Sequence, residues 1–136
     1  MKLLKFLGAF LVVAIGLFLF VVNFSAVETR YQCPGDISSH DNSQRATIFM
    51  KLNEYRWWVN LWSTSNSDGD VWLEVPHRGP EYFNHIRENG DELQFFDYNY
   101  QTTNKEYKGH FSSLSKTLSV TTSSWSFEGT CKRIEK

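Results

Sequence analysis

The stretch EYKGHFSSLSKTLSVTTSSWSFEGTCK, residues 106–132, decides the fold class because apolar and polar residues alternate along it in short runs. Successive side chains of a β-strand point to opposite faces, so this alternation indicates strands that bury one face. Pairing Phe111 with Leu118, and Val120 with Phe127, keeps the apolar residues of neighbouring strands on the same face. The stretch therefore predicts two antiparallel hairpins in succession.

The alternation extends back to Ala46, and no part of this region repeats at helical spacing. Asn89-Gly90 is a strong hairpin turn signal, and it predicts Arg87 opposite Glu92 and Phe83 opposite Phe96. We expect an all-β domain over residues 46–136, a small antiparallel meander closing as a barrel or two-sheet sandwich. Its expected strands are residues 46–52, 56–63, 70–75, 81–87, 92–100, 106–112, 117–122 and 125–132.

Two cysteines flank this domain, Cys33 before it and Cys131 near its end. In an oxidising compartment they are expected to form a disulfide, which would place the segment around Cys33 beside the last strand. Closing a loop of about 100 residues is worth roughly 4–5 kcal/mol in the chain-entropy model. Residues 28–45 are polar and are expected to form a spacer and loop.

The first 27 residues form a membrane-directing segment. Residues 6–22 are wholly apolar apart from Gly8 and Gly16, and Lys2 and Lys5 precede them. As a helix, residues 6–24 would span roughly 28 Å, close to the roughly 30 Å hydrocarbon core of a bilayer. The preceding lysines place the amino terminus in the cytoplasm and the β-domain outside it.

The leader has two interpretations. A retained transmembrane helix would hold the domain at the inner or plasma membrane, whereas a cleaved signal peptide would leave it secreted or periplasmic. The apolar run exceeds the roughly 7–15 residues of a signal peptide, and Phe24 stands where a cleavage site needs a small residue. These features favour the anchor.

A candidate binding face comes from two strongly aromatic segments. Trp57, Val59 and Leu61 are expected to align with Val71, Leu73 and Val75 on the core side. The opposite face would carry Trp58, Asn60, Trp62, Trp72 and Glu74. Aromatic rings beside an amide and a carboxylate suit a protein or glycan ligand. In the competing interpretation, a second sheet or the hairpin at residues 81–100 covers this face and the tryptophans belong to the core.

Other classes of function have little support. Lys and Arg total 14 against 15 Asp and Glu, so no basic excess favours nucleic acid. Residues 64–75 resemble part of a calcium loop, but Val75 replaces the closing Glu. The four histidines have no zinc-ligand spacing, and no Gly-x-Ser-x-Gly motif is present. We therefore predict no cofactor, no metal and no catalytic residue, and expect a non-enzymatic protein.

Two alternatives remain open. An envelope hydrolase would use His85 or His110 with a nearby carboxylate. A scaffold for neighbouring membrane proteins would use the helix, in which Gly8, Ala9 and Gly16 permit close contact.

The two ends of the exported part carry a resemblance to a known group. Tyr-x-Cys-x-Gly at residues 31–35 and Phe-x-Gly-x-Cys at residues 127–131 resemble small bacterial envelope β-domains, among them lysozyme inhibitors. The inhibitors' central Ser-Gly and Trp-x-Lys-Gly signatures are missing here. The resemblance therefore implies an architecture and transfers no functional residue.

Overall fold

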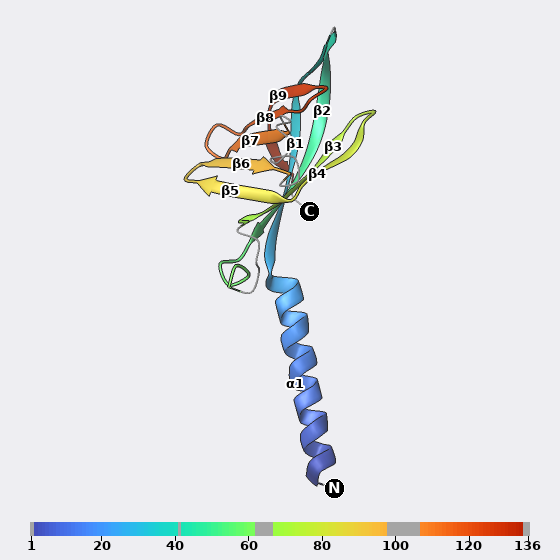
Figure 1. Ribbon diagram of the computed structural model, residues 1–136, viewed down its shortest axis with the longest axis vertical. Helices are drawn as coiled ribbons and strands as arrows, with labels where there is room; N and C mark the ends of the chain where they lie inside the picture. The colour runs from blue at the N-terminus through green and yellow to red at the C-terminus, as the bar shows by residue number, and fades with distance from the viewer. Residues whose placement is uncertain (1, 41, 62–66, 98–106, 135–136) are drawn as a thin grey trace.

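The computed structural model describes residues 2–40, 42–61, 67–97 and 107–134 (Figure 1). Helix α1 (Lys2–Phe24) runs into strand β1 (Ala26–Ser39), with Ser25 alone between them. The other described strands are β2 (Asn42–Tyr55), β3 (Gly69–Val75), β4 (Gly79–Phe83), β5 (His85–Asn89), β6 (Glu92–Phe96), β7 (Lys108–Ser112), β8 (Thr117–Thr121), β9 (Ser126–Thr130) and β10 (Lys132–Ile134).

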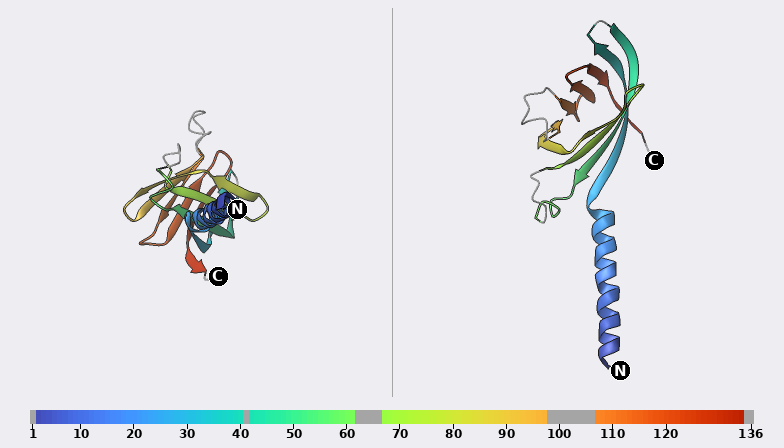
Figure 2. Two further views of the ribbon diagram at one scale, coloured as in Figure 1. Left: turned by 90° about the horizontal axis from the view of Figure 1, so that it is seen from below. Right: turned by 45° about the vertical axis from the view of Figure 1, so that its right-hand side comes forward.

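All the strand pairs in the described residues are antiparallel and belong to one ten-stranded sheet. The order is β4-β3-β2-β1-β9-β8-β7-β6-β5, and β10 pairs with β1. The sheet curls until its two ends approach one another, which gives a nearly closed barrel (Figure 2). The β1–β2 hairpin projects beyond the barrel at the end away from α1 (Figure 1).

The two ends of the sheet meet where Ser67 and Asp68 lie beside β5. The amide of Asp68 donates to the carbonyl of Ile86 at 3.1 Å, and the amide of Ile86 donates to Ser67 Oγ at 3.0 Å. The amide of Glu88 donates to Asp68 Oδ2 at 3.0 Å. Since Ser67 is almost fully buried, its hydroxyl satisfies a backbone group that water cannot reach.

The core fills the inside of the barrel with one face of each strand. Burial alternates along β1, β3 and β8, as expected for strands with one solvent-facing side. The largest fully buried side chains include Phe83 of β4, Phe95 of β6, Phe111 of β7 and Phe127 of β9. Phe83 meets Phe95 edge to face, with ring centroids 4.9 Å apart.

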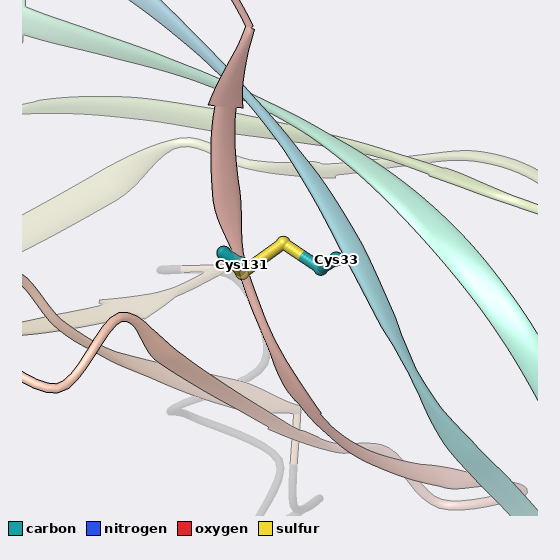
Figure 3. The surroundings of a disulfide bond; sticks show 2 residues. All are labelled: Cys33 and Cys131. Atoms are coloured by element: carbon teal, nitrogen blue, oxygen red, sulfur yellow. A yellow bond between two sulfur atoms is a disulfide. The ribbon is translucent and has the colours of Figure 1, made fainter.

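The predicted disulfide is confirmed: Cys33 and Cys131 are bonded, and both are buried (Figure 3). Strand β1 pairs with β9 on one side of Cys33 and with β10 on the other. Both stretches share one register, so the bond joins directly opposed residues whose Cα atoms are 4.0 Å apart.

The all-β antiparallel architecture and its barrel-like curvature are confirmed, and a helix precedes it as expected. The pairs Phe111–Leu118 and Val120–Phe127 are also confirmed. Within the residues that the structure describes, no helix combines the length and apolarity that a bilayer crossing requires.

The predicted register of the β5–β6 hairpin is wrong by two residues. Asn89 pairs with Glu92, so Arg87 faces Gln94 and His85 faces Phe96. The two-residue turn is Gly90-Asp91, in which Gly90 has φ +65°. Glycine at the first central position suits a type II′ turn, whereas the prediction put Asn89 there. An even shift leaves each side chain on its expected face.

Several expectations about secondary structure are wrong. Residues 56–61 form turns rather than the first part of a strand, and residues 62 and 63 lie outside the described residues. Residues 28–39, expected to be spacer and loop, belong to β1, and β2 already begins at Asn42. The expected strand at residues 81–87 is divided at Asn84 into β4 and β5, and the last one at Cys131 into β9 and β10.

Candidate functional site

A groove of about 540 Å³ crosses the outer face of the sheet over strands β1 to β4 and the end of β10. We call it the aromatic groove. It is lined by Arg30, Tyr31, Phe49, Met50, Lys51, Trp72, Leu73, Glu74, Pro80 and Ile134.

Strand register builds the groove from two rows of outward side chains. In one row Arg30 pairs with Lys51, Lys51 with Trp72, and Trp72 with Tyr82. In the next row Phe49 pairs with Glu74, and Glu74 with Pro80. Because side chains alternate between faces, residues two apart on each strand stand next to one another across the rows.

Aromatic side chains in these rows face solvent. The Trp72 and Tyr82 rings lie 4.4 Å apart between centroids, and 43% and 40% of these residues are exposed. Phe49, in the neighbouring row, is 44% exposed. Three exposed aromatic side chains on adjacent strands form an apolar patch. A ligand that covered this patch would remove its surface from contact with water.

Charged groups border the patch on the β1–β2 side. Glu28 accepts a hydrogen bond from Arg30 Nε at 2.7 Å and lies 3.2 Å from Lys51 Nζ. These two bonds, with Arg30 the larger cause, lower the pKa of Glu28. The shared carboxylate holds both cations beside Phe49 and Trp72, where a ligand's acidic group or aromatic ring could meet them.

A hydrogen-bonded cluster lies in the next row of β2 and β3. Asp70, which is buried, accepts bonds from Asn53 Nδ2 at 2.6 Å and from the Tyr55 hydroxyl at 2.7 Å. Desolvation, followed by the bond to Asp70, raises the pKa of Tyr55 far above its usual value. Burial, with the charges of Asp70 and Asp97 adding to it, raises the pKa of Tyr82. Both phenols therefore stay protonated further into the alkaline range than a free tyrosine, and the bonds to Asp70 join β2 to β3 beside the groove.

The structure brings together two of the five predicted binding residues. Trp72 and Glu74 line the aromatic groove from β3. Trp58 and Asn60 lie in the turns of residues 56–61 and do not line it, and Trp62 lies outside the described residues. The expectation that Trp57 and Leu61 belong to the core is wrong, since both are strongly exposed.

Sequence reasoning missed Arg30, Phe49, Lys51 and Tyr82 as neighbours of Trp72. Phe49 lies between the buried Ile48 and Met50, so period-two alternation alone could have placed it on the outer face. Its proximity to Trp72 and Arg30 depends on the pairing of β1, β2 and β3. That information was hidden because β1 resembled a loop.

The two histidines of the hydrolase alternative are separate from the groove. His85 is buried against Phe96, with ring centroids 4.6 Å apart. His110 Nε2 lies 2.5 Å from Glu92 Oε2, and both side chains are nearly half exposed. His110 does have a carboxylate partner, but neither histidine lines the aromatic groove. Among the described residues, no group of His, Cys, Asp and Glu has a metal-binding arrangement.

No family model, curated protein or solved structure matches this chain.

Proposed function

We propose that the chain is a non-enzymatic binding module held at the inner or plasma membrane by α1, with its β-domain outside the cytoplasm. Its ligand is a protein segment, which binds in the aromatic groove. The observation that carries this proposal is the solvent-facing patch of Trp72, Tyr82 and Phe49 beside paired cations.

The composition of the groove favours a protein ligand. Protein interfaces place aromatic and aliphatic side chains at the centre and charged groups at the rim, and Trp, Tyr and Arg dominate their binding energy. Here Phe49, Trp72 and Pro80 form the apolar part, with Lys51 and Glu74 beside them. Glu74 is the one carboxylate among the described lining residues, which favours binding over hydrolysis by a pair of carboxylates.

Membrane attachment is supported by the sequence of the helix, although its described part alone falls short of the length and apolarity of a bilayer span. Residues 6–22 are apolar apart from Gly8 and Gly16, and the 23 residues of α1 measure about 34 Å at 1.5 Å per residue. Described apolar side chains face outward around it, among them Phe6, Phe10, Val12 and Phe18. In water such a surface would be costly, whereas lipid tails would cover it.

Site-specific photocrosslinking tests the ligand assignment. A photoreactive benzoyl-phenylalanine replaces Phe49 in the full chain, in the membranes of cells that make it. The control places the same residue at Gln94, an exposed position on β6. We expect a discrete protein adduct from position 49 and none from position 94. The adduct should weaken when Trp72→Ala is added, since losing a hot spot worth about 2 kcal/mol reduces affinity roughly thirtyfold.

Three outcomes would contradict the assignment. No adduct from a folded, disulfide-bonded chain would remove the groove as a binding site. Equal adducts from both positions would indicate random collision. An adduct whose whole added mass is removed by glycan hydrolysis would make the ligand a glycan instead.

A further inference from the structure

Residues 56–61, which we call the tryptophan turn, are attached to the end of α1. The Arg56 amide donates to the Ser25 carbonyl at 2.9 Å, and Ser25 is the residue that separates α1 from β1. The preceding residue, Tyr55, pairs with Ala26 at the start of β1. Figure 1 shows this green loop at the lower left of the β-domain, level with the last turn of α1.

The tryptophan turn exposes large apolar side chains instead of burying them. Trp57 is 77% exposed and Leu61 is 71% exposed, while Trp58 and Val59 are only partly buried. The turn is nonetheless ordered by its own hydrogen bonds, from the Val59 amide to the Arg56 carbonyl at 2.9 Å and from the Leu61 amide to the Trp58 carbonyl at 3.3 Å. A backbone held in this way keeps the Trp57 and Leu61 side chains exposed close to the end of α1.

We infer that the tryptophan turn lies in the interface of the same bilayer that holds α1, with Trp57 and Leu61 among the lipid headgroups and upper acyl chains. This inference rests on the proposed membrane anchor. A helix of about 34 Å ends near the edge of a hydrocarbon layer of about 30 Å, so a loop bonded to Ser25 stands at headgroup depth.

The chemistry of the turn suits this depth. Tryptophan is enriched at membrane–water interfaces, because its ring is largely apolar but carries a polar N–H. Arg56 is exposed beside it, and a cation near the surface is attracted to anionic lipids. Leucine adds apolar area, as on the lipid-facing side of interfacial helices.

Lipid is a better occupant for this turn than the protein segment proposed for the aromatic groove. The turn shares no lining residue with the groove. Its position is set by Ser25, at the one end of the domain from which the helix leaves. Two attachments, α1 and the turn, would stop the barrel from rotating about the helix axis and would fix the direction in which the groove faces.

Fluorescence quenching by lipid tests the inference. The full chain is reconstituted into vesicles of phosphatidylcholine and phosphatidylglycerol, with or without phosphatidylcholine brominated on its acyl chains. Trp57→Phe is compared with Trp72→Phe. The second variant is the matched control, because it makes the same substitution at a tryptophan that lines the aromatic groove. We expect the fraction of fluorescence quenched by lipid to fall in Trp57→Phe and not to fall in Trp72→Phe. Phenylalanine retains most of the ring, and an intact disulfide with native near-ultraviolet circular dichroism verifies folding.

The outcomes separate this inference from the membrane anchor. If the chain does not float with the vesicles in a density gradient, the anchor itself fails. If it floats but Trp57→Phe leaves lipid quenching unchanged, the inference is overturned and the anchor stands. If Trp57 is shielded from both brominated lipid and aqueous iodide, a protein contact covers the turn, and the inference is likewise overturned.

Discussion

Gly109 lies directly under the ring of Phe95, its partner on the neighbouring strand β6. A Cβ atom at position 109 would overlap three atoms of that ring. Phe95 is fully buried, so the ring has no open space into which it can turn. The absence of a side chain on β7 is thus what allows a phenylalanine to fill this part of the barrel.

Gly109→Ala should therefore destabilise the domain. Overpacking of a close-packed core costs about 1–3 kcal/mol, which urea unfolding followed by tryptophan fluorescence would detect. Ser119→Ala, at an exposed position on β8, is the control and should leave the unfolding midpoint nearly unchanged. Adding Phe95→Leu should recover part of the loss, and a Gly109→Ala variant as stable as wild type would contradict the steric explanation.

Loss of the Cys33–Cys131 bond should lower the free energy of unfolding by about 4–5 kcal/mol, because a crosslink across 98 residues restricts the unfolded chain strongly. The measurement compares the double variant Cys33→Ala/Cys131→Ala with wild type in urea. Reducing the wild type should reproduce the effect of the double variant. An unchanged midpoint in both experiments would mean that the barrel is stable without the crosslink.

His77→Gly should stabilise the β3–β4 hairpin. Val75 to Arg78 form a turn closed by the Arg78 amide on the Val75 carbonyl at 3.2 Å, and His77 has φ +62°. A residue with a Cβ pays roughly 1–2 kcal/mol for a left-handed conformation that glycine adopts freely, although glycine also loses more entropy on folding. We expect a net gain of about 0.5–1 kcal/mol in urea unfolding. Ser119→Gly in β8 should be destabilising, and the same sign for both changes would refute the argument.

Mild acid should destabilise the closing edge of the barrel through His85. Burial lowers the pKa of this imidazole, the charge of Arg87 adds to the effect, and Asp68 opposes it. The unfolded state, with a pKa near 6.5, then binds the proton more readily than the folded state. His85 therefore contributes stability that is complete above pH 6.5 and is lost as the pH falls from there towards the folded pKa.

Urea unfolding at pH 7.5 and pH 5.5 measures this difference. His85→Gln should remove most of the dependence in this window, whereas His110→Gln, with an exposed imidazole, serves as the comparison. Glu28 has a lowered pKa and titrates further into acid, whereas burial raises the pKa of Glu88, so protonation of Glu88 favours the folded state and opposes the effect of His85. Equal pH dependence in wild type and His85→Gln would exclude His85 as the sensor.

Much of the second half of the barrel could be predicted from sequence, because the order within β7, β8 and β9 is local. Short turns between alternating strands leave few possible registers, and the pairs Phe111–Leu118 and Val120–Phe127 follow from keeping apolar residues on one face. The β5–β6 register failed for a related reason: Asn89 and Gly90 are both common turn residues. The identity of these two residues alone does not decide which of them is the first residue of the loop.

The first half could not be predicted because its order is non-local. Strand β1 contains Pro34 and Gly35 among polar residues, a local pattern typical of a loop. It is a strand because β2 covers one edge while β9 and β10 cover the other. For residues 56–61 the error was the opposite one. Their aromatic residues have high strand propensity and predicted a strand, but they form turns after the end of β2. The aromatic groove includes Arg30 and Tyr31 of β1, so this side of its lining was hidden as well.

The direct passage from α1 into β1 has a mechanical consequence. With Ser25 alone between them, tension on the helix acts along the length of β1. The ladder to β2 runs from Ala26 to Ser39, so its hydrogen bonds resist such a load together, in shear, rather than opening one after another. The Cys33–Cys131 bond then transfers the load covalently from β1 to the segment that joins β9 and β10, along the other edge of β1. A pull at the base should therefore move the domain as a whole before it peels any strand away.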